Sequence, residues 1–328
     1  MPYEADRLYA VGVKIRTEQL IGVVVDVNGE ITRSPRPDGD TPASRRTQIE
    51  GTDVTTVVTG VAELVGELVA VDPAFEEPLG VGVEISGQVD DKAGVVQRSH
   101  RMGWEQSVPL ARLVEDATGL PTMVDHDVKI LVQAEQLFGL GQNHGSFAVV
   151  TAGLGIGAGL VIDHEIKRGI SGTAGELGHM VLEPEGAPCS CGNRGCLETV
   201  AGTDGILRRL HAEGRTEVHT IERAAELARG DDETALAAFR HAGTALGYGL
   251  SWLVNWMNPG LVVVRADPAM RASMVYEQAA LAAYRAHAFY GSIGACKLVF
   301  MDHEHELGAR SAGSMVFEML GDRLREPG

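Results

Sequence analysis

Apolar runs of two lengths alternate along the chain. The first three, residues 8–15, 19–27 and 29–34, are short, rich in Val and Ile and separated by polar or glycine-containing turns. They predict three strands of a meander. Residues 33–46 are rich in Pro, Gly and charge and predict a loop, whereas residues 53–70 carry apolar side chains at helical spacing. The chain is therefore expected to open with a sheet followed by a helix.

The alternation of strands and helices continues to the end of the chain. Further strands are predicted at 79–86, 121–126, 146–155, 157–166, 261–266 and 296–302. Further helices are predicted at 108–119, 127–139, through most of 199–258, at 272–286 and at 309–324. Strands that alternate with helices after a leading meander indicate an α/β fold with mixed sheets.

Composition and charge narrow the function classes. The chain has 328 residues, of which 44% are hydrophobic, enough for a large core. Its net charge of −17 would repel a phosphate backbone, so direct binding of nucleic acid by this chain is not expected. The N-terminus lacks the basic start and apolar core of a signal peptide, and no run of 18 uncharged apolar residues occurs. We expect a cytoplasmic protein that does not contact membranes.

Three of the four cysteines fall within eight residues, and a histidine precedes them. His179, Cys189, Cys191 and Cys196 supply three thiolates and one imidazole, a closed set of four ligands suited to structural Zn²⁺. Gly192 and Gly195 allow the tight turns that such a loop needs. The alternative is a cluster of buried, metal-free thiols. Because the set leaves no position open for water, zinc here would shape the loop rather than perform chemistry.

Two segments of the chain resemble the ROK family of repressors, open reading frames and kinases. They are Gly-Glu-Leu-Gly-His at 175–179 and Cys-Ser-Cys-Gly-Asn-Arg-Gly-Cys-Leu-Glu at 189–198. The resemblance implies a two-lobed, actin-like (ribonuclease H-like) fold with mixed sheets, a structural zinc loop at 179–196 and a sugar bound in the cleft between the lobes. It places one lobe at 1–125, with a helix at about 308–328 packing back onto it, and the other at 126–307.

The same resemblance implies a set of sugar-binding residues. Asp127 stands at the position of the family's general base, and His126 stands where the kinases have Asn. A helix-capping role for Asp127 is the alternative, and it is compatible with the first. The other implied ligand-binding residues are Ser86, Gly87, Glu176, His179 and Glu198. For Glu176 and Glu198 the alternative is support of the zinc loop.

The family's ATP-binding segments are altered at three places. Lys14 stands in place of the Asp that opens the first phosphate loop, and no Gly-Gly-Thr follows it. Leu154 replaces the hydroxyl residue of the second loop, and Arg265 and Ala266 replace a Gly-Gly pair near the adenosine. Three changes directed at one ligand indicate that ATP is not bound in the family's manner.

These features favour the sugar-binding body of a ROK transcriptional regulator. Regulators of the family carry an N-terminal helix-turn-helix, whereas the first strand predicted here begins at residue 8, so we expect an effector domain without a DNA-binding segment. The resemblance also suggests a homodimer or homotetramer. The alternatives are a glucokinase-like sugar kinase or a divergent biosynthetic enzyme with Asp127 as base, and a structural partner protein that binds no ligand.

Overall fold

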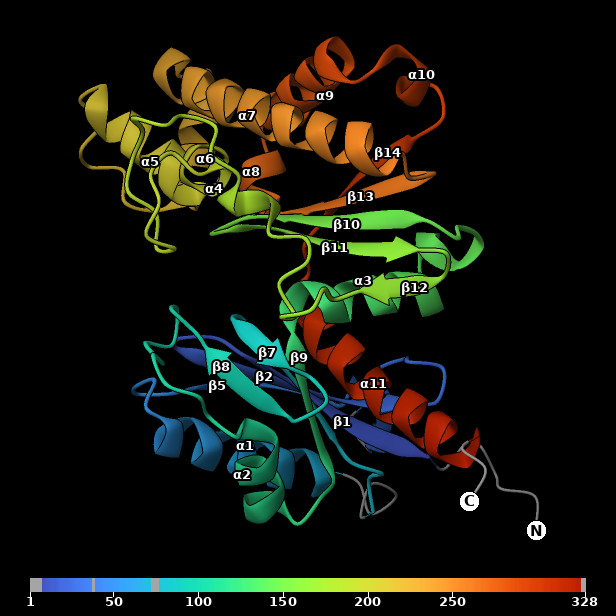
Figure 1. The fold of residues 1–328 in the computed structure, drawn as a ribbon. Helices are drawn as coiled ribbons and strands as arrows, with labels where there is room; N and C mark the ends of the chain where they lie inside the picture. The colour runs from blue at the N-terminus through green and yellow to red at the C-terminus, as the bar shows by residue number, and fades with distance from the viewer. Residues whose placement is uncertain (1–7, 37–38, 72–76, 326–328) are drawn as a thin grey trace. The chain divides into compact units, whose positions relative to one another are not determined.

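The computed structural model describes residues 8–36, 39–71 and 77–325 (Figure 1). Their contacts divide the chain into two compact units, each with its own apolar core. Unit 1 comprises the chain up to residue 142, residues 169–172 and the chain from residue 304, and unit 2 comprises 143–168 and 173–303. Unit 1 extends past the lobe boundary expected after residue 125, because the helix that follows it packs against the C-terminal helix.

A five-stranded mixed sheet forms the centre of unit 1, in the order β5-β2-β1-β6-β9. β1 (Tyr9–Ile15) pairs antiparallel with β2 (Gln19–Asp26), and β2 pairs antiparallel with β5 (Ser44–Gln48). On the other side, β6 (Val81–Ile85) and β9 (Thr122–His126) run parallel to β1. The long apolar runs of β1, β2 and β6 reflect strands that are buried on both faces.

Two glycines allow a helix to lie close to this sheet. A Cβ at Gly12 or at Gly82 would come within 1.8 Å of a carbonyl oxygen of α11 (His305–Arg325). Because neither residue has a side chain, the backbones approach each other directly. Helix α1 (Val54–Val69) also packs against the sheet, and the side chain of Asp53 caps it.

The prediction of a third meander strand at residues 29–34 is wrong. Residues 29–34 add only a single bridge to this sheet, between Ile31 and Val25, and the strand beside β2 is β5, which begins inside the predicted loop. Part of the same loop forms the two-stranded ribbon of β3 (Arg33–Arg36) and β4 (Gly39–Pro42). β5 has the sequence Ser-Arg-Arg-Thr-Gln and lies at the sheet edge, so it lacks the apolar alternation that marks a buried strand.

The remaining elements of unit 1 follow β6 and β9. The ribbon of β7 (Gln88–Asp90) and β8 (Val95–Arg98) precedes α2 (Leu110–Thr118), which ends at Gly119 in the left-handed conformation. Helix α3 (Asp127–Leu137) begins directly after β9, and a short 3₁₀ helix, η3 (Leu140–Asn143), follows. The predicted helices at 53–70, 108–119 and 127–139 are confirmed.

The sheet of unit 2 repeats the arrangement of the first, in the order β12-β11-β10-β13-β14. β10 (Phe147–Ala152), β11 (Ile156–Ile162) and β12 (Glu165–Lys167) are antiparallel neighbours, whereas β13 (Leu261–Ala266) and β14 (Lys297–Asp302) run parallel to β10. The expected α/β architecture with mixed sheets is confirmed in both units.

Helices cover the sheet of unit 2 (Figure 1). The elements are η4 (Leu177–His179), α4 (Leu197–Ala201), α5 (Thr203–Ala212), α6 (Ile221–Arg229), α7 (Glu233–Met257), α8 (Pro268–Arg271), α9 (Val275–His287) and α10 (Tyr290–Ile293). α7 and α9 pack most closely, because Gly243 and Gly247 of α7 face the backbone of α9. In the described part of the chain, no helix combines the length and the hydropathy needed to cross a membrane.

Candidate functional site

The four predicted metal ligands lie together in unit 2. His179 ends η4, and Cys189, Cys191 and Cys196 lie in the loop that leads to α4, with all four donor atoms within 4.8 Å of one another. The sulfurs of Cys191 and Cys196 are 3.6 Å apart, and Nδ1 of His179 is 3.4 Å from the sulfur of Cys189. A tetrahedral zinc site with Zn–S bonds of about 2.3 Å separates its sulfurs by roughly 3.8 Å. The spacing therefore fits a shared tetrahedral ion, and it is too long for a disulfide.

The loop folds back on itself to present these ligands. The N–H groups of Leu182 and Glu183 both donate to the carbonyl of Gly195, and the N–H of Cys189 donates to the carbonyl of Asn193. Gly195 has a φ of 64°, and a Cβ there would lie 1.5 Å from the carbonyl oxygen of Glu183. Only glycine permits this turn, as the sequence predicted.

Burial and hydrogen bonds shift the pKa values of the three thiols in different directions. Burial raises the pKa of Cys189 and of Cys196. Burial acts in the same direction on Cys191, but the N–H of Asn193 and the thiols of Cys189 and Cys196 donate to it and bring its pKa below the ordinary value. Cys191 is thus the thiol of the cluster that loses its proton most readily, and a divalent cation would favour the thiolate form of all three. This donor set fits Zn²⁺.

Two carboxylates flank the imidazole of His179. Its Nδ1 lies 3.6 Å from Oε1 of Glu198, and its Nε2 lies 3.8 Å from Oε2 of Glu176. The thiol of Cys189 donates to Oε1 of Glu198 at 3.1 Å, so Glu198 supports the metal loop whether or not it also binds a ligand. Nδ1 faces the sulfur cluster, which leaves Nε2 on the side of Glu176. The three residues expected to bind sugar in this unit are therefore brought together.

The remaining expected sugar ligands lie in unit 1, at the carboxyl ends of two neighbouring parallel strands. Ser86 and Gly87 follow β6, and Asp127 follows β9. The hydroxyl of Ser99 donates to the carbonyl of Ser86 at 2.6 Å. Gly87 has a φ of 143°, and a Cβ there would lie 2.4 Å from the carbonyl oxygen of Arg98. The turn after β6 is thus held close to the end of β8.

His126 caps helix α3, a role that the capping alternative assigned to Asp127. β9 ends at His126 in an extended conformation, so Asp127 becomes the first helical residue. Nδ1 of His126 accepts the N–H of Val128 at 3.3 Å, while its Nε2 lies 3.2 Å from Oδ1 of Asp127. A neutral ring with Nδ1 as acceptor would carry its proton on Nε2, which faces the carboxylate of Asp127. His126 therefore orients the carboxylate of Asp127.

A buried ion pair of Lys14 and Glu84 lies beside these residues. Lys14 was singled out from the sequence, but its partner Glu84 was not. Nζ of Lys14 donates to Oε1 of Glu84 at 2.6 Å, across the parallel pairing of β1 with β6. Lys14 and Glu84 are 8% and 1% exposed, and Oε2 of Glu84 has no hydrogen-bond partner among the described residues. Burial raises the pKa of Glu84, although Lys14 draws it down. A single charge inside each of two apolar strands, with opposite signs, was the available sequence signal.

The other positions at which this chain differs from the family's ATP-binding segments lie in unit 2. Leu154 is half-exposed in the turn between β10 and β11. Nη1 of Arg265 donates to the carbonyl of Asp302 at 3.3 Å, and Arg271 forms ion pairs with Glu277 and Asp302. The segment that replaces Gly-Gly is thus connected to a network of side chains.

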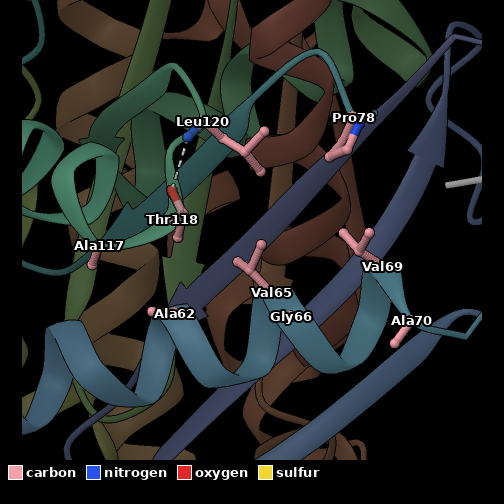
Figure 2. Close-up of a pocket in the computed structure, with 9 residues that line it drawn as sticks. All are labelled: Ala62, Val65, Gly66, Val69, Ala70, Pro78, Ala117, Thr118 and Leu120. Atoms are coloured by element: carbon pink, nitrogen blue, oxygen red, sulfur yellow. Dashed lines mark hydrogen bonds between the residues drawn. The ribbon is translucent and has the colours of Figure 1, made fainter. Parts of the chain in front are cut away.

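An apolar hollow in unit 1 lies between α1, α2 and the residues that precede β6 and β9 (Figure 2). Its lining is aliphatic except for Thr118, whose hydroxyl accepts the N–H of Leu120 at 3.2 Å. None of the lining residues carries a titratable side chain. The hollow therefore offers no group for acid–base chemistry.

Comparisons of sequence match the chain to glucokinases and xylose repressors. The family model described as "ROK family" matches residues 11–318. A glucokinase of Halalkalibacterium halodurans is 34% identical over 201 residues, which cover 57% of this chain and 60% of the kinase. The xylose repressor of Bacillus subtilis is 26% identical over 258 residues, which cover 78% of this chain and 64% of the repressor. Each match spans less than two thirds of the relative.

Comparisons of structure agree on the fold. A ROK family transcriptional regulator, described as a homolog of the Escherichia coli Mlc protein, superposes with a TM-score of 0.82 at 22% identity, covering 98% of this chain and 80% of the regulator. The ROK hexokinase of Thermus thermophilus superposes with a TM-score of 0.76 at 26% identity, covering 96% of this chain and all of that chain (100%). Since the family model matches all but the two ends of the sequence, the chain belongs to the ROK family.

Proposed function

We propose that this chain is a zinc-containing ROK protein that binds a sugar and acts as a regulator-type effector domain, without the ATP binding of the family's kinases. The observation that carries the proposal is the grouping of Glu176, His179 and Glu198 beside the cysteine cluster. Two carboxylates and an imidazole N–H offer acceptors and a donor in fixed positions. A sugar presents hydroxyls that both donate and accept, so this set suits its recognition.

The cysteine loop would hold the sugar-binding groups in place. His179, Cys189, Cys191 and Cys196 would bind the zinc ion, which would supply a fixed tetrahedral anchor and no open coordination position. With Nδ1 of His179 directed at the cluster, Nε2 must carry the ring proton and is available to a sugar oxygen or to Glu176. The metal would thus fix the tautomer of a ligand-binding imidazole.

In unit 1 the proposed ligand-binding groups are His126, Asp127 and the turn at Ser86 and Gly87. The carboxylate of Asp127 is held by the N–H of Val128 at 2.7 Å and by His126, and its side chain is 32% exposed. An oriented and accessible carboxylate is suited to accept a sugar hydroxyl. The absence of a side chain at Gly87 lets the backbone approach a ligand closely.

The buried pair of Lys14 and Glu84 supports the absence of nucleotide binding. An ammonium paired at 2.6 Å inside the sheet is engaged with its own carboxylate, and β1 ends without the glycines that would let backbone N–H groups reach a phosphate. Leu154 and Arg265 support the same conclusion in unit 2.

One observation favours a second candidate, an enzyme that uses Asp127 as a general base. A general base needs a fixed orientation and reach to a substrate proton, and His126 supplies the orientation. A glucokinase-like sugar kinase or a divergent biosynthetic enzyme would use this pair. The curated relatives include glucokinases as well as xylose repressors.

Titration calorimetry with a panel of sugars tests the proposal. Glucose, xylose, N-acetylglucosamine, N-acetylmannosamine and their phosphates are titrated into the zinc-loaded chain. At least one should bind, and Glu198→Gln should weaken that ligand about 10-fold to 100-fold, because it removes a charged acceptor. Glu185→Gln, an exposed residue of the same loop, is the matched control and should leave affinity unchanged. Absence of binding across the whole panel would refute sugar binding.

A further inference from the structure

The cysteine loop of unit 2 presents one accessible sulfur. Among the four described cysteines only Cys191 is exposed, whereas Cys189, Cys196 and Cys296 are buried. All residues at 190–194 are exposed as well, so a small reagent in solvent reaches the sulfur of Cys191 directly. The susceptibility of a cysteine to oxidation rises with its exposure. Cys191 is therefore the first sulfur of the loop that an oxidant meets.

A second sulfur lies within reach of Cys191. The sulfurs of Cys191 and Cys196 are 3.6 Å apart, so a relative shift of roughly 1.5 Å brings them to the bond length of a disulfide. A Cβ at Gly192 would meet no atom within 4 Å, and this open space gives the segment of Cys191 room for the shift. Cys189 is engaged elsewhere, because its thiol donates to Oε1 of Glu198 at 3.1 Å. The geometry thus favours Cys196 as the partner.

Cys196 is connected to two residues of the proposed sugar site. Its thiol donates to the carbonyl of His179 at 3.5 Å, and it directly precedes α4, whose second residue is Glu198. The N–H of Leu197 also donates to the carbonyl of Met180 at 2.8 Å, next to His179. A displacement of Cys196 therefore acts on both the imidazole of His179 and the carboxylate of Glu198.

We propose that Cys191 and Cys196 form an oxidation site, at which a peroxide joins the two sulfurs in a disulfide and the metal is lost from the loop. The disulfide removes two of the four ligands, and His179 and Cys189 alone do not complete a tetrahedral site. The loop then loses the anchor that orders His179 and Glu198. The resulting loss of sugar affinity rests on the proposed function, whereas the disulfide and the loss of metal do not.

Hydrogen peroxide supplies the oxidising equivalents. The sulfur of Cys191 attacks one oxygen of the peroxide, so that an S–O bond forms, the O–O bond breaks and the other oxygen leaves as hydroxide. The sulfur of Cys196 then attacks the sulfur of this sulfenic acid, so that the S–S bond forms, the S–O bond breaks and a second hydroxide leaves. Each hydroxide becomes water with a proton from the attacking thiol, or from solvent when that sulfur is a metal-bound thiolate. Two sulfurs are oxidised by two electrons in total, and one peroxide is reduced to two waters.

Peroxide titration of the zinc-loaded chain tests the proposal. A metallochromic indicator measures released zinc, and peptide mass spectrometry without reduction locates the crosslink. About one equivalent of hydrogen peroxide should release about one equivalent of zinc and join Cys191 to Cys196. Amide hydrogen exchange of residues 176–201 should increase at the same time, because the loop loses its anchor. Dithiothreitol with added zinc should reverse all three changes.

Cys191→His separates metal binding from oxidation. An imidazole at this position still binds zinc but forms no disulfide, so peroxide should release zinc at least about 10-fold more slowly than from the wild type. Cys296→Ser, which removes a buried thiol outside the loop, is the matched control and should release zinc as the wild type does. If Cys191→His retains no zinc, the crosslink map of the wild type decides by itself.

Three results would overturn the oxidation site. They are zinc retained by the peroxide-treated wild type, a crosslink that includes Cys189, and sulfinic acid at Cys191 without a crosslink. The oxidised chain should also bind the sugar found by calorimetry about 10-fold more weakly, because a site that must order its groups on binding loses affinity. Equal affinity in the oxidised and reduced chains would overturn the link to the sugar site. Absence of any sugar ligand would refute the proposed function alone, since neither the zinc nor the crosslink measurement uses a sugar.

Discussion

The two units share a sheet topology but differ at the turn that joins their first two strands. In unit 1, Arg16, Thr17 and Glu18 form the turn between β1 and β2. In unit 2, Gly153, Leu154 and Gly155 form the turn between β10 and β11. The first turn contains no glycine, whereas the second contains two, and glycine is the residue that lets a backbone approach a phosphate most closely.

The candidate site residues also occupy different places in the two units. In unit 1 they lie at the carboxyl ends of β6 and β9, whereas in unit 2 they lie on η4 and the cysteine loop. A repeated sheet topology fixes where the strands end, but it does not determine which functional side chains stand at those ends. Each unit must therefore be tested through its own residues.

The largest effect is expected in the cysteine loop of unit 2. Cys191→Ser removes one of four ligands, so the bound metal should fall from about one equivalent to nearly none. Because structural zinc contributes on the order of 10 kcal/mol to the folding of small zinc domains, the melting temperature should fall as well. Elemental analysis and calorimetry measure both. Cys296→Ser, outside the cluster, should keep the metal, and full metal content in Cys191→Ser would contradict the assignment.

In unit 1 the largest effect should come from the buried ion pair. Lys14→Met leaves the carboxylate of Glu84 buried without its partner, which should lower the free energy of unfolding by about 3–5 kcal/mol. Urea unfolding at neutral pH measures this loss. Lys92→Met, an exposed position in the same unit, should change the free energy by less than about 0.5 kcal/mol.

The loss of stability in Lys14→Met should depend on pH. The folded-state pKa of Glu84 is raised, so its contribution to stability is fully present below the ordinary carboxyl pKa and is lost as the pH rises through the folded value. Without Lys14 that folded pKa rises further. The deficit of Lys14→Met should therefore shrink as the pH falls from 7 toward 5, and it should lose this pH dependence in Lys14→Met/Glu84→Gln. A deficit independent of pH in the single variant would contradict the pairing.

An intermediate effect is expected at the oriented carboxylate of unit 1. Asp127→Asn should weaken the sugar found by calorimetry about 10-fold to 100-fold, because a neutral amide replaces a charged acceptor. Its thermal stability should change little, since His126 still caps α3. Asp116→Asn, an exposed carboxylate of α2, is the control. Unchanged affinity in Asp127→Asn would remove this residue from the proposed site.

The smallest effect is expected at the glycine turn of unit 2. Leu154→Thr restores the hydroxyl of the family's loop at a half-exposed position, so its stability should change by less than about 0.5 kcal/mol. ATP should still not bind, because the first turn of unit 1 and Arg265 are unchanged. Equilibrium dialysis with labelled ATP measures this. Tight ATP binding by the variant would show that one residue, rather than three altered segments, excludes the nucleotide.

The sequence predicted the features that depend on local spacing. The cysteine cluster, strands β10 and β11 and helices such as α1 follow from residues that are near neighbours in the chain. β5 was missed because a polar edge strand carries no apolar period.

Features that depend on distant partners could not be predicted. The pairing of Lys14 with Glu84 spans 70 residues. The contact of the His126 ring with Asp127 also depends on β9, which pairs with the distant strand β6 up to His126.

The central claim is that this ROK chain binds a sugar without transferring phosphate to it. A coupled assay for ADP release, run with Mg-ATP and the sugar that binds in calorimetry, tests it most directly. The account predicts ligand binding with no turnover above background, in the wild type and in Asp127→Asn alike. ATP-dependent phosphorylation of the sugar by the wild type, abolished in Asp127→Asn, would contradict it and identify the chain as a kinase.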